Sequence, residues 1–133
     1  PPRSTLFPYT TLFRSEPVTF PHKEIMRLPI HVEDIAEAFV RVLLADTSHY
    51  PIYNSGGHAI SLGDLAGMVK EFLPESQINF DNEGGRELSG NYMVDNSRLR
   101  DEFEIEYAPF RQRVLEIINE VRIDSGLPVV TGR

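Results

Sequence analysis

Apolar residues recur at helical spacing in three stretches of this chain, and the first stretch is the most regular. From Arg27 to Ala45 the sequence predicts a short strand, a turn at His31 and Val32, and an amphipathic helix. Three acidic residues, Glu33, Asp34 and Glu37, are expected in the first helical turn, where the positive end of the helix dipole favours carboxylates. One face of the helix is apolar throughout, at steps of three and four residues, and comprises Ile35, Ala36, Phe39, Val40, Leu43 and Leu44.

Two further amphipathic helices are predicted later in the chain. Ser61 can cap the first of them, Asp64 completes a capping box, and Pro74 ends the helix. Pro109 is well placed in the first turn of the other. Their apolar faces comprise Leu62, Leu65, Ala66, Val69, Phe72 and Leu73 in the one, and Phe110, Val114, Ile117, Ile118 and Val121 in the other.

Short strands are predicted between the helices. They span residues Lys23–Ile30, Pro51–Asn54, Gln77–Asp81 and Tyr92–Val94. The turn Ser55–Gly57 closes the second strand, and Asp95 can cap a short helix that runs to Phe103. Beyond it, glutamates at positions 102, 104 and 106 alternate with apolar residues, which most simply predicts one solvated strand face.

The composition is that of a soluble globular domain. The chain has 133 residues, of which 41% are hydrophobic and 25% charged. It holds no apolar run long enough to span a membrane, so no membrane partner is expected. Cysteine is absent, which excludes a thiol nucleophile and fits a cytoplasmic protein. The net charge of −7 gives no basic footprint for nucleic acid.

The first fifteen residues differ in character from the rest. Thr5–Ser15 resembles one reading frame of a sequencing adapter translated as if it were coding DNA. We therefore treat residues 1–15 as a non-native segment and exclude them from fold reasoning. The alternative is a genuine β-hairpin that uses Thr-Leu-Phe twice. We expect residues 16–125 to form one folded unit that is a fragment of a larger enzyme, with residues 126–133 as a tail.

The lead-in to the first helix resembles a known family. An arginine on a strand, followed by a His-Val-x-Asp turn that opens a helix, resembles the sugar-nucleotide epimerase/dehydratase family, the extended short-chain dehydrogenases/reductases. The matching residues here are Arg27, His31, Val32 and Asp34. The resemblance continues through Tyr53-Asn54 with its glycine pair, the Ser61 helix, Asp95 with Ser97, and Pro109. The chain departs from the family at Gly84-Gly85-Arg86-Glu87 and at Phe103-Glu104-Ile105, where the family has Arg-Pro-Gly-Asp and Leu-Gly-Trp.

The resemblance implies an α/β fold, namely the C-terminal substrate-binding part of a Rossmann-type enzyme, with several helices, short strands and the Rossmann core missing. It implies NAD or NADP as cofactor of the parent enzyme and allows a homodimeric parent. The chain itself has no glycine-rich dinucleotide fingerprint, and none of its five tyrosines is followed by lysine four residues later. We therefore assign it no catalytic and no cofactor-binding residue, and expect the fragment to bind no cofactor and to be inactive alone.

Substrate handling is what the resemblance leaves to this chain. By matched position, Arg27 and Arg86 would contact a diphosphate or another anionic group of a nucleotide-linked sugar, and Asn54 would line the pocket. The simpler reading of both arginines is a surface ion pair. His31 and Asp34 are expected to hold the strand–helix turn rather than to act as acid or base. The remaining histidines lack ligand spacing, so we predict no metal site.

Two alternatives to the enzyme-fragment hypothesis remain at this level. One is a free-standing, non-catalytic ligand-binding module, which would have a start codon near Glu16 and fold as a soluble monomer. The other is a structural or interaction protein that uses its helix faces. The fragment hypothesis instead predicts an exposed apolar surface where the missing domain packs.

Overall fold

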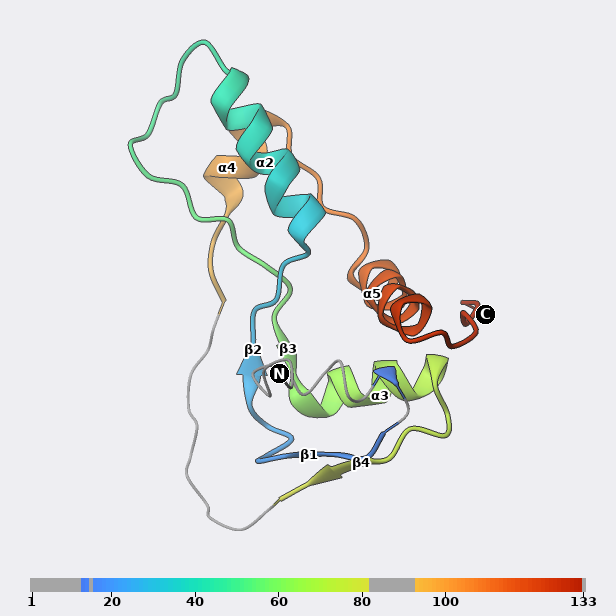
Figure 1. The fold of residues 1–133 in the computed structure, drawn as a ribbon. Helices are drawn as coiled ribbons and strands as arrows, with labels where there is room; N and C mark the ends of the chain where they lie inside the picture. Colours follow the sequence, from blue (N-terminus) through green and yellow to red (C-terminus); the bar gives the residue numbers. More distant parts are fainter. Residues whose placement is uncertain (1–12, 15, 82–92, 133) are drawn as a thin grey trace, which may run out of the picture.

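The computed structural model describes residues 13–14, 16–81 and 93–132, and within them it contains four helices and two small two-stranded sheets (Figure 1). The elements are β1 (Val18–Phe20), β2 (Met26–Arg27), α2 (Val32–Leu44), β3 (Ile60–Ser61), α3 (Leu62–Phe72), β4 (Ile78–Phe80), α4 (Ser97–Phe103) and α5 (Phe110–Asp124). The predicted α/β class is therefore confirmed.

The larger of two hydrophobic cores is built on α3. Strands β1 and β4 pair in parallel, with Val18 opposite Ile78 and Phe20 opposite Phe80, and α3 and α5 contribute to the same apolar cluster (Figure 1). Val69 and Ile118 are completely buried there. We call this cluster the α3 core; it comprises Phe13, Val18, Phe20, Ile25, Leu62, Ala66, Val69, Phe72, Leu73, Ile78, Val114 and Ile118.

The start of α3 confirms Ser61 as the predicted helix cap. The Ser61 hydroxyl accepts a hydrogen bond from the Asp64 N–H at 3.0 Å and donates one to the Asp64 carboxylate at 2.7 Å. Just before the cap, β3 pairs antiparallel with β2, so that Arg27 lies opposite Ile60. These bonds satisfy amide groups that a helix start would otherwise leave unpaired.

The smaller core lies between α2 and α4, at the far end of the molecule from β1 and β4 (Figure 1). We call it the α4 core; its buried members are Ala38, Leu99, Phe103 and Ile105, with Ile35, Val42, Tyr53 and Tyr107 packed against them. The chain reverses at Glu104, which ends α4 in the left-handed conformation with φ of 51°. This reversal returns Ile105 to the core.

Most of the predicted apolar face of α2 points away from both cores, although Ile35 packs against the α4 core. Phe39 is 70% exposed and Leu43 is 82% exposed, and Val32, Val40 and Leu44 are exposed as well. The helix buries instead the narrower side that carries Asp34 and Ala38. Glu37 and Arg41 form an i, i+4 ion pair at 2.7 Å on the outer side of the helix.

Three strand predictions were wrong. The strand predicted over Tyr92–Val94 does not form at Met93 or Val94, and Tyr92 lies outside the described residues. Pro51–Asn54 forms no strand, because no other strand among the described residues lies beside it to supply hydrogen bonds. The strand predicted over Lys23–Ile30 is reduced to Met26–Arg27, whose only partner is the two-residue β3. The last two segments carry strand-like sequences without a wide sheet to join.

Phe13 belongs to the segment that the sequence analysis set aside, yet its side chain is buried in the α3 core. The neighbouring Arg14 donates from Nε to the Ser125 hydroxyl at 3.1 Å, and Arg122 donates to the Phe13 carbonyl at 3.4 Å. The described part of this segment is therefore packed against the C-terminal helix, whatever its origin.

Among the described residues, no helix combines the length and the apolar character needed to cross a bilayer.

Candidate functional site

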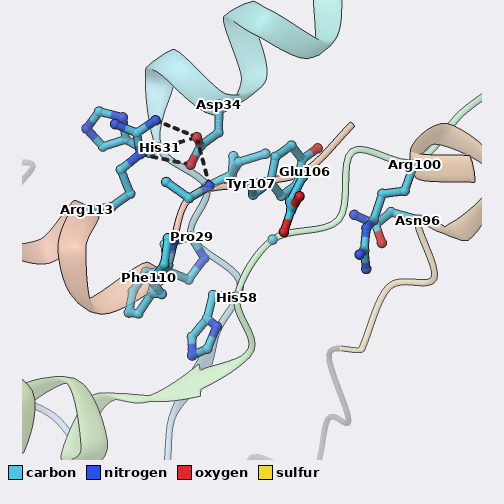
Figure 2. Close-up of a pocket in the computed structure, with 14 residues that line it drawn as sticks. Pro29, His31, Asp34, His58, Asn96, Arg100, Glu106, Tyr107, Phe110 and Arg113 are labelled. Atoms are coloured by element: carbon cyan, nitrogen blue, oxygen red, sulfur yellow. Dashed lines mark hydrogen bonds and ion pairs between the residues drawn. The ribbon is translucent and has the colours of Figure 1, made fainter. Parts of the chain in front are cut away.

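A cleft of about 340 Å³ opens where the N-termini of α2 and α5 meet the loop before β3 and the start of α4 (Figure 2). Its volume lies near the lower end of the range usual for small-molecule sites. The lining residues are Pro29, Ile30, His31, Asp34, Gly57, His58, Asn96, Arg100, Glu106, Tyr107, Ala108, Pro109, Phe110 and Arg113.

One wall of the cleft is an ion pair between α2 and α5. Arg113 donates from Nη2 to Asp34 Oδ1 at 2.6 Å and from Nε to both carboxylate oxygens at 3.2 Å (Figure 2). The Ala108 N–H also points to Asp34 Oδ1, at 3.4 Å. Both side chains are largely buried, so this ion pair fixes α2 to α5. Removal of either side chain would leave the other as an unpaired buried charge.

The electrostatics of this wall follow from the geometry. Burial alone would raise the pKa of Asp34, but hydrogen bonds from Arg113 and the Ala108 N–H outweigh it and hold that pKa below its ordinary value of 3.8. Hydrogen bonds to Asp34 and Glu116 raise the pKa of Arg113 above its already high value. Both groups are therefore charged throughout the physiological range.

His31, Glu33 and Glu116 bring one possible metal-ligand atom each to within 4.8 Å of one another. Arg113 Nη1, however, already donates to Glu33 Oε2 at 2.8 Å and to Glu116 Oε2 at 2.6 Å. The guanidinium thus supplies the positive charge that these carboxylates need, and a metal ion would have to displace it. This cluster is better described as the outer part of the α2–α5 ion-pair network.

The opposite wall is the loop that precedes β3, and its position is fixed from two sides. The Ser55 carbonyl accepts hydrogen bonds from Asn96 Nδ2 at 3.1 Å and from the Tyr107 hydroxyl at 2.6 Å. Gly56 and Gly57 then turn the chain with φ of 70° and 150°. A Cβ on Gly57 would come within 2.7 Å of the Leu28 carbonyl oxygen, so only glycine fits without a shift.

The floor and the far end carry an aromatic pair and two charged side chains. The His58 ring stacks on Phe110, with centroids 4.3 Å apart and planes within 9°. Arg100 lines the cleft beside Asn96, and Glu106 lines it beside Tyr107 (Figure 2). The site thus presents a ring face, an amide and one charge of each sign.

Only some of the site residues predicted from the sequence line the cleft in the structure. His31 caps α2, where its Nδ1 accepts from the Glu33 N–H at 3.2 Å, and both His31 and Asp34 line the cleft. Arg27 is exposed and donates to the Met26 carbonyl, and it is not part of the cleft wall. Asn54 donates to the Asp95 carbonyl at 3.1 Å, next to the cleft. Arg86 lies outside the described residues.

Sequence reasoning missed the residues that hold the site together. Arg113, Asn96 and Tyr107 belong to no pattern that we had singled out, and Arg113 falls among several charged positions of the last helix. One signal was available: a carboxylate expected to brace a turn needs a cation if that turn is buried. The sequence does not say which of the 13 lysines and arginines supplies it.

A second polar cluster lies outside the cleft, where hydrogen bonds link the loop after α2 to α4. Glu102 accepts from the Tyr53 hydroxyl at 2.7 Å and from the His49 N–H at 2.8 Å, and the His49 ring nitrogen Nδ1 is 3.0 Å from the same carboxylate. Burial and the nearby Glu102 carboxylate raise the pKa of Tyr53. With the Tyr53 ring against Phe103, this cluster closes the edge of the α4 core.

Comparison with known proteins gives a likeness of fold. No family model matches the chain, and no curated protein matches it in sequence. The structure is similar to a partial-consensus L-threonine 3-dehydrogenase, with a TM-score of 0.68 and 16% identity over 86% of this chain and 40% of that one. It is also similar to a GDP-L-fucose synthetase from Naegleria fowleri, with a TM-score of 0.58 and 14% identity over 89% of this chain and 37% of that one.

Both neighbours are extended short-chain dehydrogenases/reductases, the family that the sequence motifs resemble. The chain spans about two fifths of the length of either neighbour. The described fold is therefore similar to a part of the fold of these two enzymes.

Proposed function

We propose that this chain is the substrate-side part of an NAD(P)-dependent epimerase, dehydratase or reductase. The observation that carries the proposal is the uncovered apolar face of α2, with Phe39 and Leu43 at its centre. Exposed apolar patches of this kind mark surfaces that another domain or protein covers. In both structural neighbours the matching fold is a minor share of the chain, so a larger body accompanies it there.

The nicotinamide would be held by that other body. A dinucleotide needs a glycine-rich turn between a strand and a helix N-terminus, and the described residues offer none. The residues present therefore do not fit this cofactor, and we derive no redox step through them. The contribution of this chain is the cleft, which would receive part of a small polar substrate; the sequence resemblance suggests a nucleotide-linked sugar.

The cleft is suited to that task because its walls are preformed. The Asp34–Arg113 pair fixes one side, and the two hydrogen bonds to the Ser55 carbonyl fix the other. A substrate entering it would order few side chains, which lowers the entropic cost of binding.

The decisive experiment is to re-sequence the gene across the codon for Glu16 and to express the complete reading frame. We expect a glycine-rich βαβ unit and a Tyr-x-x-x-Lys pair upstream, and an extended protein that binds NAD⁺ or NADP⁺ in isothermal titration. The present chain is the matched control and should bind neither. A reading frame that starts near Glu16 would overturn the proposal in favour of a free-standing binding module.

A further inference from the structure

Some of the charged side chains that line the cleft are paired with side chains of opposite charge, and others are not. Asp34 and Arg113 bind each other, and the rest of the Arg113 guanidinium is taken by Glu33 and Glu116. The side chains of Arg100 and Glu106 make no ion pair or hydrogen bond with any of the described residues. One free cation and one free anion therefore remain on the cleft wall.

The backbone explains why these two side chains, which flank the end of α4, both line the cleft. The left-handed turn at Glu104 reverses the chain, and the Ile105 N–H returns to the Arg100 carbonyl at 3.1 Å. Tyr107 is then anchored to the Ser55 carbonyl. Glu106, held between these two fixed points, lines the same cleft as Arg100, and Figure 2 shows it beside Tyr107.

We propose that the pair Arg100 and Glu106 forms a binding site for a small zwitterion that carries an ammonium group and a carboxylate. The Arg100 guanidinium would receive the carboxylate through two parallel hydrogen bonds, and Glu106 would receive the ammonium group. This inference rests on the proposed function, and for the same cleft it names a substrate class other than the nucleotide-linked sugar that the sequence resemblance suggests.

A zwitterion fits this wall better than a simple anion does. A ligand that fills the cleft removes water from both side chains, and each loses solvation that only an opposite charge restores. A phosphate or diphosphate would satisfy Arg100 but would stand beside the Glu106 carboxylate, which repels it. Because like charges placed together are strongly unfavourable, Glu106 would disfavour an anionic ligand relative to a zwitterion.

The test is a titration of the isotope-labelled full chain, followed by two-dimensional NMR without any cofactor. The probe is L-alanine; L-alaninamide lacks the carboxylate, N-acetyl-L-alanine lacks the ammonium group, and UDP-glucose is a nucleotide-linked sugar. We expect L-alanine to shift the signals of Gly57, Tyr107 and the Arg100 side chain with a dissociation constant of about 1 mM. The two alanine derivatives should bind about tenfold more weakly or not at all.

Substitutions localise the effect. Arg100→Gln and Glu106→Gln should each weaken L-alanine binding by about tenfold, a loss of ~1.4 kcal/mol. Arg98→Gln and Glu120→Gln change exposed residues of the same types outside the cleft and should leave binding unchanged. All four side chains are exposed, so the substitutions should leave the fold intact. Unchanged NMR signals from residues distant from each substitution will show that the variant is folded.

Three outcomes would overturn the zwitterion site. They are the absence of saturable shifts with L-alanine, equal binding of L-alanine and its two derivatives, and unchanged binding by the two cleft variants. Tight binding of UDP-glucose that Glu106→Gln strengthens would assign the cleft to an anion instead. None of these outcomes bears on the upstream reading frame, so a failure here is distinct from a failure of the proposed function.

Discussion

The two cores of this molecule are stabilised in different ways. The α3 core is made of twelve buried apolar residues contributed by helices and strands from most of the chain. The α4 core has four, and polar contacts surround it: the Asp34–Arg113 pair on one side and the Glu102 cluster on the other. An apolar core tolerates many substitutions that keep its volume and apolar character. A buried charge, in contrast, destabilises the fold as soon as its partner is removed. The half that carries the cleft is therefore the more easily broken.

The largest effect should come from removing one member of the buried ion pair. Arg113→Met leaves the Asp34 carboxylate buried without its cation, and we expect a loss of about 4 kcal/mol in the free energy of unfolding. Urea denaturation followed by circular dichroism measures it. The double variant Asp34→Asn/Arg113→Met removes both charges and should recover part of the loss; if it is as unstable as the single variant, the ion-pair explanation is wrong.

The next largest effect should come from a cavity in the α3 core. Ile118→Ala removes three carbons from a completely buried position and should cost about 3 kcal/mol. The same substitution at Ile123, which is 62% exposed on the same helix, is the matched control and should cost less than about 0.5 kcal/mol. Equal losses at the two positions would contradict the burial described for α5.

Acid should weaken the cleft half first. The pKa of Asp34 is lowered in the folded state, so its charge contributes stability above the ordinary pKa of 3.8, and this contribution is lost as the pH falls through the folded value. Hydrogen bonds from Arg113 and Gln112 lower the pKa of Glu116 in the same way. We expect the free energy of unfolding to decline below about pH 4.5.

Asp34→Asn is the control for this pH dependence, because its side chain cannot titrate. The decline in stability with acid should be shallower in this variant than in the parent chain when both are followed by urea denaturation at several pH values. Parallel pH profiles would mean that other carboxylates account for the acid sensitivity.

Two glycine-to-alanine substitutions, one in the loop before β3 and one inside α3, should change the free energy of unfolding in opposite directions. Gly57→Ala places a Cβ within 2.7 Å of the Leu28 carbonyl at a positive φ and should cost about 1–3 kcal/mol. Gly67→Ala, inside α3 with open space around it, should add about 0.5–1 kcal/mol. Thermal unfolding of both variants measures the difference, and a stabilising Gly57→Ala would show that the loop before β3 is not held as described.

The smallest effect on stability should come from the outward face of α2. Phe39→Lys changes a side chain that is 70% exposed, so the free energy of unfolding should move by less than about 0.5 kcal/mol. Its effect should instead be on self-association, because the apolar face is uncovered. Sedimentation velocity should show fewer aggregates than for the parent chain. Glu37→Gln, also exposed on α2, raises the net charge by one as Phe39→Lys does and serves as the control for charge.

Helix positions were predictable from this sequence because they rest on local signals. The Ser61–Asp64 capping box, the spacing of Val69 and Phe72, and Pro109 all act within a few residues. Tertiary partners were not predictable in the same way. Tyr53 and Asn54 carry a strand-like sequence, yet whether they form a strand depends on a neighbour elsewhere in the chain.

The candidate site shows the same division between local and distant information. His31 and Asp34 could be singled out as a turn because they are close in the sequence. The partner of Asp34 on α5 could not, since several arginines were available to it. Glu106 was predicted to lie on a solvated strand face with Glu102 and Glu104; the left-handed turn at Glu104 ended that alternation and sent Glu102 and Glu106 to different sites.

The parallel pairing of β1 with β4 has a consequence for the order in which the chain folds. Val18 can meet Ile78 only after the whole of α2, β3 and α3 has been accommodated between them. Contacts between such distant residues must offset the entropy of closing a long loop before they add any stability, so they form late. Helix α3, with its local cap, is thus the natural nucleus, and the strand pair that completes its core is the step that sets the folding rate.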